Sequence, residues 1–306
     1  MSALRAHVAD YLRLRRALGY RLEREERLLG QFCSYLEAAG AATVTSRHAI
    51  DWARQPAGAQ PAQWASRLGA IRRFAAWLNV LDPAAEIPPA GVFPARRNRR
   101  VPYLWSEDQV RGLLAGARAV RTPLLAATLE ALFGLLAVSG MRIGEAVALR
   151  RGDVSLDAGV ITVREAKHGR ERLVPLHPTA AAALREYAAE RDRLCPRPRS
   201  GTFFLSSTGT ALDRSGAGKH FRKITTAAGI RTAACRPHVH DLRHAFAVTT
   251  LTRWVREGQD ADANIALLSA YLGHVSPSDT YWYLSASPEL MELAALRLAG
   301  PGGQPR

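Results

Sequence analysis

The stretch GVITVREAKHGRERLVPL, at residues 159–176, is the most β-rich segment of this sequence. Its two halves, residues 159–166 and 171–176, flank a four-residue turn at 167–170 that contains a glycine, which is the pattern of a hairpin. Apolar residues in the other periodic segments recur every three or four positions, which is the spacing of helices. We therefore expect a mainly α protein with a small β-sheet, an α+β fold.

Helix signals flank this hairpin on both sides. Residues 106–109 (SEDQ) have the pattern of a capping box, which begins a helix. A long apolar helix is expected from Pro123 to Ser139, with Gly140 as its C-terminal stop, and Arg142 opens a further helical stretch. After the hairpin, helices are expected at about residues 178–193, 214–228, 238–255, 261–272, 277–284 and 288–298.

The N-terminal part of the chain predicts helices only, at about residues 4–18, 23–39, 46–52 and 61–79. Ser46 is the expected N-cap of the third of these helices. Residues 82–103 are rich in proline and arginine, and proline opposes helix, so this segment predicts an extended linker. We expect a helical domain at residues 1–81, the linker at 82–103 and a second domain at 104–306.

The charge of the chain indicates a polyanionic partner. Its 306 residues include 42 Lys and Arg against 27 Asp and Glu, a formal net charge of +15 with a pI near 10.7. Basic proteins gain affinity for nucleic acid by displacing counterions from phosphates, so nucleic acid is the leading candidate. The alternative is a basic surface without such a function.

Cysteine usage and hydropathy narrow the class of protein further. The three cysteines, Cys33, Cys195 and Cys235, form no CxxC pair, so neither a disulfide framework nor a cysteine zinc site is expected. No apolar run reaches the length of a membrane span, and the first 30 residues lack the apolar core of a secretory signal. We expect a reduced, cytoplasmic protein, bacterial and associated with the nucleoid.

Four short motifs carry the candidate chemistry. His240 and Arg243 lie three residues apart in HDLRHAFAVTT (240–250), on one helix face, where a guanidinium and an imidazole together suit a phosphate. Alone, an HxxR pair is more often a solvated helix face. Arg142 stands at a helix start, Lys167 lies in the hairpin turn, and Tyr283 follows His274 by nine residues. None of these features decides the function by itself.

Taken in order, these motifs resemble the tyrosine recombinase (phage integrase) family. SGMRIGEAVALRRGDV (139–154) is similar to the first arginine box of the family, HDLRHAFAVTT to its second box, and LGHVSPSDTYWY (272–283) to its histidine-to-tyrosine segment. Residues 279–291 (DTYWYLSASPELM) also look like transposon-borne members. The resemblance implies a helical core-binding (SAM-like) domain and a helix-rich catalytic domain with a three-stranded sheet, which together form a clamp around DNA.

The resemblance implies a site-specific recombinase or integrase that cuts and rejoins DNA without metal or ATP, with no cofactor. Tyr283 would be the nucleophile that forms a 3′-phosphotyrosyl intermediate, and His240 its candidate base. Arg142, Arg243 and His274 would bind the phosphate, while Lys167 would protonate the leaving 5′-oxygen. Glu145 would hold an arginine or histidine in place. The partners would be double-stranded DNA, further copies in a tetramer on paired sites, and partner recombinases, with no membrane.

Several alternatives stay open at this point. Tyr281 is the rival nucleophile, and Glu145 could be a simple helical partner of Arg142. Lys167 could be a solvated turn residue, as could Arg170 or Lys219. The function could also be that of a type IB topoisomerase-like relaxase or of a non-catalytic DNA-binding protein. The arginines expected to contact DNA lie around the fourth helix and in the linker: Arg67, Arg72, Arg73, Arg96, Arg97, Arg99 and Arg100.

Overall fold

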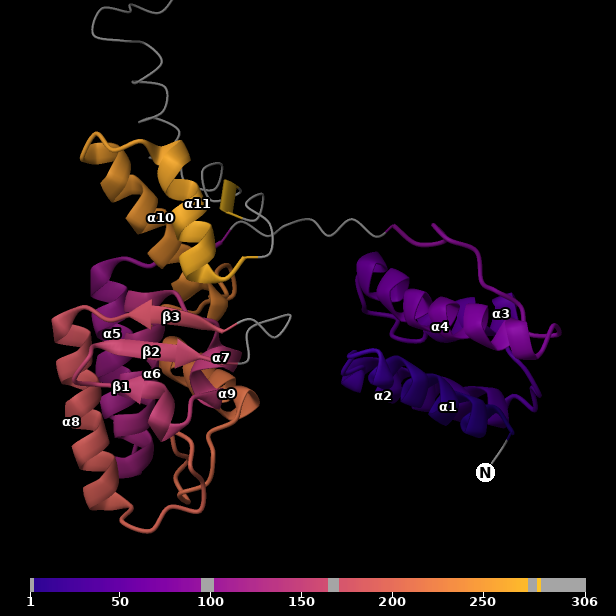
Figure 1. Cartoon of the computed structure of the whole chain (residues 1–306), viewed down its shortest axis with the longest axis horizontal. Helices are drawn as coiled ribbons and strands as arrows, with labels where there is room; N and C mark the ends of the chain where they lie inside the picture. Colours follow the sequence, from indigo (N-terminus) through magenta and orange to yellow (C-terminus); the bar gives the residue numbers. More distant parts are fainter. Residues whose placement is uncertain (1–2, 95–101, 165–170, 275–279, 282–306) are drawn as a thin grey trace, which may run out of the picture. The chain divides into compact units, whose positions relative to one another are not determined.

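The chain forms two compact units, residues 1–100 and 101–306, in a computed structural model that describes residues 3–94, 102–164, 171–274 and 280–281 (Figure 1). Helices dominate both units, and the second unit contains one three-stranded sheet. The expectation of a mainly α fold with a small sheet is therefore confirmed.

The N-terminal unit packs four helices around aromatic side chains. They are α1 (Ala3–Ala17), α2 (Glu23–Ala38), α3 (Ser46–Arg54) and α4 (Pro61–Leu81). Phe32, Trp52 and Phe74 are fully buried between them. One expected cap is wrong: α3 is capped by Thr45, which has extended backbone and accepts the amide of His48, whereas Ser46 already lies in the first helical turn.

The first part of the expected linker packs on the N-terminal unit. Residues 82–94 form no helix, as their prolines predict, but Ala85 and Phe93 are buried in the N-terminal core. The amide of Glu86 donates to the carbonyl oxygen of Val44 at 2.8 Å. The first half of the segment therefore packs on the helices, which corrects the expectation of a linker that begins at residue 82. Residues 95–101 lie outside the described residues.

The C-terminal unit is built around one apolar helix. Its elements are α5 (Glu107–Arg118), α6 (Pro123–Ser139), α7 (Ile143–Ala148), a 3₁₀ turn (Arg151–Asp153), β1 (Val154–Ser155), β2 (Val160–Val163), β3 (Arg172–Pro175), α8 (Pro178–Leu194), α9 (Arg214–Ala227), α10 (His240–Arg256) and α11 (Ala261–Leu272). Helix α6 is buried almost all round and contacts α5, α8 and α10. The capping box at residues 106–109 is confirmed, because Ser106 and Gln109 bond each other's backbone amides.

In Figure 1 the strands lie in front of α6, and the buried side chains of the sheet belong to the same core as those of α6. The strand order is β1-β2-β3 and both pairs are antiparallel, with Ile161 opposite Val174. These two side chains are fully buried, while Leu173, the neighbour of Val174 on β3, is exposed, the alternation of a sheet with one solvated face. Strand β3 contacts α11 and carries Arg172 at its first position.

Two helix ends bring distant segments together in this unit. Helix α6 ends at Gly140, whose φ of 60° is the left-handed conformation of a C-terminal glycine cap. Helices α10 and α11 pack on each other through Leu251, Leu268 and Leu272. Of the expected C-terminal helices at 277–284 and 288–298, only residues 280–281 are described. Within the described part of the chain, no helix is long and apolar enough to cross a membrane.

Candidate active site

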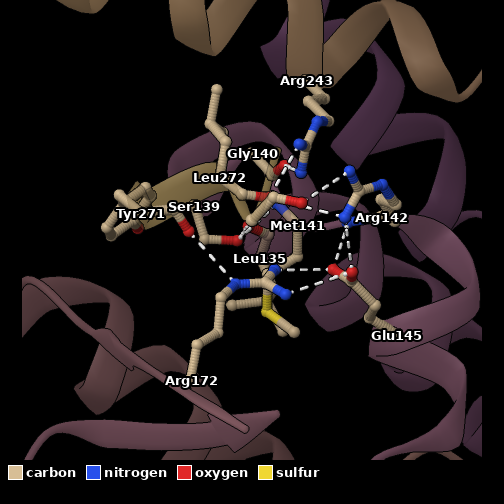
Figure 2. Close-up of polar contacts among 11 residues, drawn as sticks. Leu135, Ser139, Gly140, Met141, Arg142, Glu145, Arg172, Arg243, Tyr271 and Leu272 are labelled. Atoms are coloured by element: carbon tan, nitrogen blue, oxygen red, sulfur yellow. Dashed lines mark hydrogen bonds and ion pairs between the residues drawn. The ribbon is translucent and has the colours of Figure 1, made fainter. Parts of the chain in front are cut away.

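Arg142 is the N-cap residue of α7, and its side chain joins two segments that are far apart in the sequence. Its Nη1 donates to Glu145 Oε1 at 2.8 Å, one helical turn away. Its Nη2 donates to the carbonyl oxygen of Gly273 at 3.0 Å, 131 residues further along the chain (Figure 2). The Arg142 side chain keeps 31% of its surface exposed, so it remains accessible to an anion.

Arg243 contacts the same region from the first turns of α10. Its Nη1 donates to the carbonyl oxygen of Gly140 and its Nη2 to that of Leu272, both at 2.8 Å (Figure 2). The residue is only 1% exposed. The interpretation of this pair as a solvated helix face is therefore wrong for Arg243, because its guanidinium is buried between the end of α6 and the end of α11.

His274 directly follows the two residues whose carbonyls these arginines bind. Its Nδ1 lies 2.7 Å from Thr280 Oγ1, and Thr280 is fully buried. A hydrogen bond at one ring nitrogen fixes the orientation of an imidazole. The structure thus brings Arg142, Arg243 and His274 together around one turn, at residues 272–274.

His240 lies on α10 one turn before Arg243, with its ring 4.7 Å from that of His244 in an edge-to-face pair. Desolvation by the surrounding protein, followed by the positive charges of Arg243, Arg142 and Arg214, lowers the pKa of His240 to about 4. The side chain is exposed, so water and salt screen part of this effect. Desolvation and the three nearby cations both disfavour the protonated ring and so lower its pKa. His240 is therefore a neutral base at pH 7.

Arg172, at the start of β3, is a member of this cluster that was not identified from the sequence. Its Nη1 and Nη2 donate to the two carboxylate oxygens of Glu145 at 3.1 and 2.7 Å, and its Nε to the carbonyl oxygen of Tyr271 at 3.1 Å (Figure 2). Its only signal in the sequence is an arginine near the start of a β-rich segment. A charged residue in that position ordinarily indicates an exposed strand end.

Glu145 is held between two guanidinium groups. Burial alone would raise the pKa of this carboxyl, but the hydrogen bonds and charge of Arg172, followed by those of Arg142, outweigh it and lower the pKa from 4.5 to about 2. Its side chain is 7% exposed. The structure thus places Glu145 against two arginines, beyond a simple helical pair with Arg142.

Other residues expected in the site lie outside the described part of the chain. These are Lys167 in the hairpin turn, Tyr283, and the linker arginines Arg96, Arg97, Arg99 and Arg100. Tyr281, the rival nucleophile, is described and has 47% of its surface exposed. It follows Thr280, the residue that holds His274.

The three arginines expected on the fourth helix all make contacts within the N-terminal unit. The guanidinium of Arg67 stacks 3.7 Å above the ring of Trp52 and donates to its carbonyl oxygen at 3.0 Å. Arg72 donates to the carbonyl oxygen of Pro88, and Arg73 lies 3.5 Å from a carboxylate oxygen of Glu25. Their expected contact with DNA stays a prediction.

Comparison with known proteins identifies the family. The sequence profile of the phage integrase family matches residues 105–289, which include all the described members of the cluster. This chain belongs to the phage integrase family. Members of this family named tyrosine recombinases and integrases cut and rejoin DNA strands, so the chain is an enzyme of this type, a site-specific DNA recombinase.

Individual members of the phage integrase family match most of the chain. A putative integrase/recombinase of Sinorhizobium fredii is 42% identical over 97% of this chain and 98% of its own length. The tyrosine recombinase XerD of Caulobacter vibrioides is 29% identical over 76% of this chain and 73% of its own length. The solved Tn1549 transposon integrase, bound to transposon right end DNA, shares the fold with a TM-score of 0.66 at 16% identity, over 98% of this chain and 100% of that one.

Proposed function

We propose that this recombinase acts on duplex DNA through a covalent 3′-phosphotyrosyl intermediate, with Tyr283 as the nucleophile. The observation that carries the proposal is the convergence of Arg142, Arg243 and His274, from three separate elements, on the turn at residues 272–274. Covalent attachment divides strand transfer into two reversible steps and conserves the bond energy, so rejoining needs no ATP.

The described residues are suited to bind a phosphate whose charge increases at the transition state. The bonded side chains of this cluster include three guanidinium groups, of which Arg142 and Arg172 contact the carboxylate of Glu145 while Arg243 contacts backbone carbonyls, so these four residues keep a net positive charge. Arg142, Arg243 and His274 would bind the non-bridging oxygens, the role of preorganised donors in an active site. Neutral His240 would take the proton of the tyrosine. Lys167 would protonate the leaving 5′-oxygen, a role supported by its place in the hairpin turn of the family pattern.

This reaction uses side-chain cations where nucleases use metal ions. Two-metal catalysis needs several converging carboxylates. In the described residues, no group of three or more His, Cys, Asp or Glu is arranged to hold a metal ion. The proposed mechanism assigns charge neutralisation to Arg142 and Arg243, because their guanidinium groups meet at the turn of residues 272–274.

The remaining parts of the proposal concern assembly on DNA. The N-terminal unit would act as the core-binding domain, and the arginines of residues 95–101 would follow the phosphate backbone. A solved lambda integrase is a tetramer bound to a Holliday junction and shares this fold with a TM-score of 0.59, which supports a tetramer on paired sites. Relatives named integrase and recombinase favour recombination over relaxation by a topoisomerase-like reaction. Such an enzyme would work in the bacterial cytoplasm, on nucleoid DNA.

Covalent trapping tests this proposal. Nicked duplexes that tile the DNA flanking the gene of this chain are incubated with wild type, Tyr283→Phe and Tyr281→Phe, and protein–DNA adducts are separated under denaturing conditions. An adduct that only Tyr283→Phe loses supports the mechanism and its nucleophile. Loss only in Tyr281→Phe overturns the assignment of Tyr283. Tight binding without any wild-type adduct overturns the catalytic proposal in favour of a DNA-binding protein.

A further inference from the structure

Arg172 contacts both Glu145, which binds Arg142, and the backbone that leads to His274. It is the first residue of β3, and its side chain is 12% exposed. All three of its side-chain nitrogens donate to protein acceptors, two to Glu145 and one to the carbonyl oxygen of Tyr271 (Figure 2). Each of its three nitrogens thus has a protein acceptor, and the side chain is less exposed than that of Arg142, which keeps 31% of its surface exposed.

The first connection leads to Arg142 through Glu145. Glu145 Oε1 accepts from Nη1 of both Arg142 and Arg172, while Oε2 accepts from the backbone amide of Arg142 and from Arg172 Nη2. The carboxylate is thus fixed at both oxygens. Without Arg172, Glu145 would keep only its two bonds from Arg142, and the connection of this pair to β3 would be lost.

The second connection leads to His274 through the chain that precedes it. The consecutive carbonyls of Tyr271, Leu272 and Gly273 accept from Arg172, from Arg243 and from Arg142, respectively. Gly273 has a φ of 68°, and a Cβ at this position would lie 2.9 Å from Nη1 of Arg172. The turn that precedes His274 therefore lies directly against the guanidinium of Arg172.

We propose that Arg172 is a positioning residue that fixes Arg142 and His274 relative to each other for the strand-transfer reaction, without touching DNA itself. The inference rests on the proposed function, because it assigns those two side chains to the scissile phosphate. A planar guanidinium reaches three acceptors at once, which a lysine ammonium at the end of a flexible chain does not reproduce. A displacement of a reacting group by about 1 Å can cost about 10²-fold in rate.

The experiment compares wild type with Arg172→Lys, Arg172→Ala and Arg142→Lys on the trapped nicked duplex. The measurements are the rate constant of adduct formation with DNA saturated by protein, and the DNA affinity over a series of salt concentrations. Arg191→Lys is the matched control. Arg191 is also a buried arginine that bonds a carbonyl, that of Phe203, and an acidic neighbour, Asp192, but it lies on α8, away from the cluster.

Both Arg172 variants should form the adduct about 10²-fold more slowly than wild type, with the salt slope of DNA binding unchanged. Millimolar guanidinium chloride should restore part of the rate of Arg172→Ala, while sodium chloride at the same concentration should not. Arg191→Lys should lower thermal stability and leave the rate constant of the folded protein at the wild-type value.

Three results would overturn the inference. One is a wild-type rate in the folded Arg172 variants, and another is rate loss in Arg191→Lys as large as in Arg172→Lys. The third is a fall of about one in the salt slope of Arg172→Ala, since that is the effect of a lost phosphate contact. If wild type itself forms no adduct, the proposed function fails and this inference fails with it. A wild-type adduct with unaffected Arg172 variants defeats this inference alone.

Discussion

Replacing Glu145 by glutamine should destabilise the C-terminal unit by about 3 kcal/mol near pH 7. The pKa of this carboxyl falls from 4.5 to about 2 in the folded chain, and about 1.36 kcal/mol accompanies each pKa unit. Its side chain is 7% exposed, so solvent screens the two arginine pairs little. Glutamine keeps the shape but turns an amide donor toward a guanidinium, and removal of one partner of a buried ion pair typically costs about 3–5 kcal/mol.

The pH dependence of this effect has a defined sign. Because the folded pKa lies below the unfolded one, the stabilisation by Glu145 is complete above about pH 4.5 and is lost as the pH falls toward about 2. Near pH 3, about 2 kcal/mol of it should be gone. The difference between wild type and Glu145→Gln should therefore shrink as the solution is acidified.

Urea unfolding is the appropriate assay, because an ionic denaturant would screen the ion pairs. The two units can unfold separately, so the signal should come from hydrogen exchange in peptides that cover α7 and β3. Glu130→Gln is the matched control: Glu130 pairs with Arg118 in the same unit, but at 31% and 65% exposure, and should cost at most about 1 kcal/mol. Equal losses in the two variants, or a Glu145→Gln loss that does not change with pH, would refute the reasoning.

Further predictions follow from other parts of the same unit. Gly140→Ala should lower calorimetric stability by about 2–4 kcal/mol, since a Cβ at φ 60° would lie 2.5 Å from Phe246 Cδ1; an unchanged transition would contradict it. Burial, followed by the charges of His240 and Arg243, lowers the pKa of His244 to about 3. Below about pH 6.5, His244 therefore binds a proton in the unfolded chain but not in the folded chain. The free energy of unfolding should fall by about 2 kcal/mol by pH 5 in wild type, and this loss should be absent in His244→Gln. Excess EDTA should leave adduct formation unchanged, and activity that depends on added magnesium would disprove the metal-free mechanism.

Local signals were sufficient to predict most of the helices. The capping box at residues 106–109, the stop at Gly140 and the apolar spacing of 123–139 each act within a few residues, and the structure has the helices there. The same reasoning failed where packing decided the outcome. Proline correctly excluded helix from residues 82–94, but it does not reveal that Phe93 is buried against the N-terminal helices.

The sequence by itself determined the family of this protein, its mainly helical class, and the order in which its candidate catalytic side chains occur. Only the tertiary structure decided that Arg243 is buried and that Arg172 is joined to Glu145. These contacts connect residues 27 to 103 positions apart, between helix ends and a strand. Capping and periodicity act within one or two helical turns, whereas the partner of a buried guanidinium depends on which distant carbonyls the folded core brings within about 3 Å.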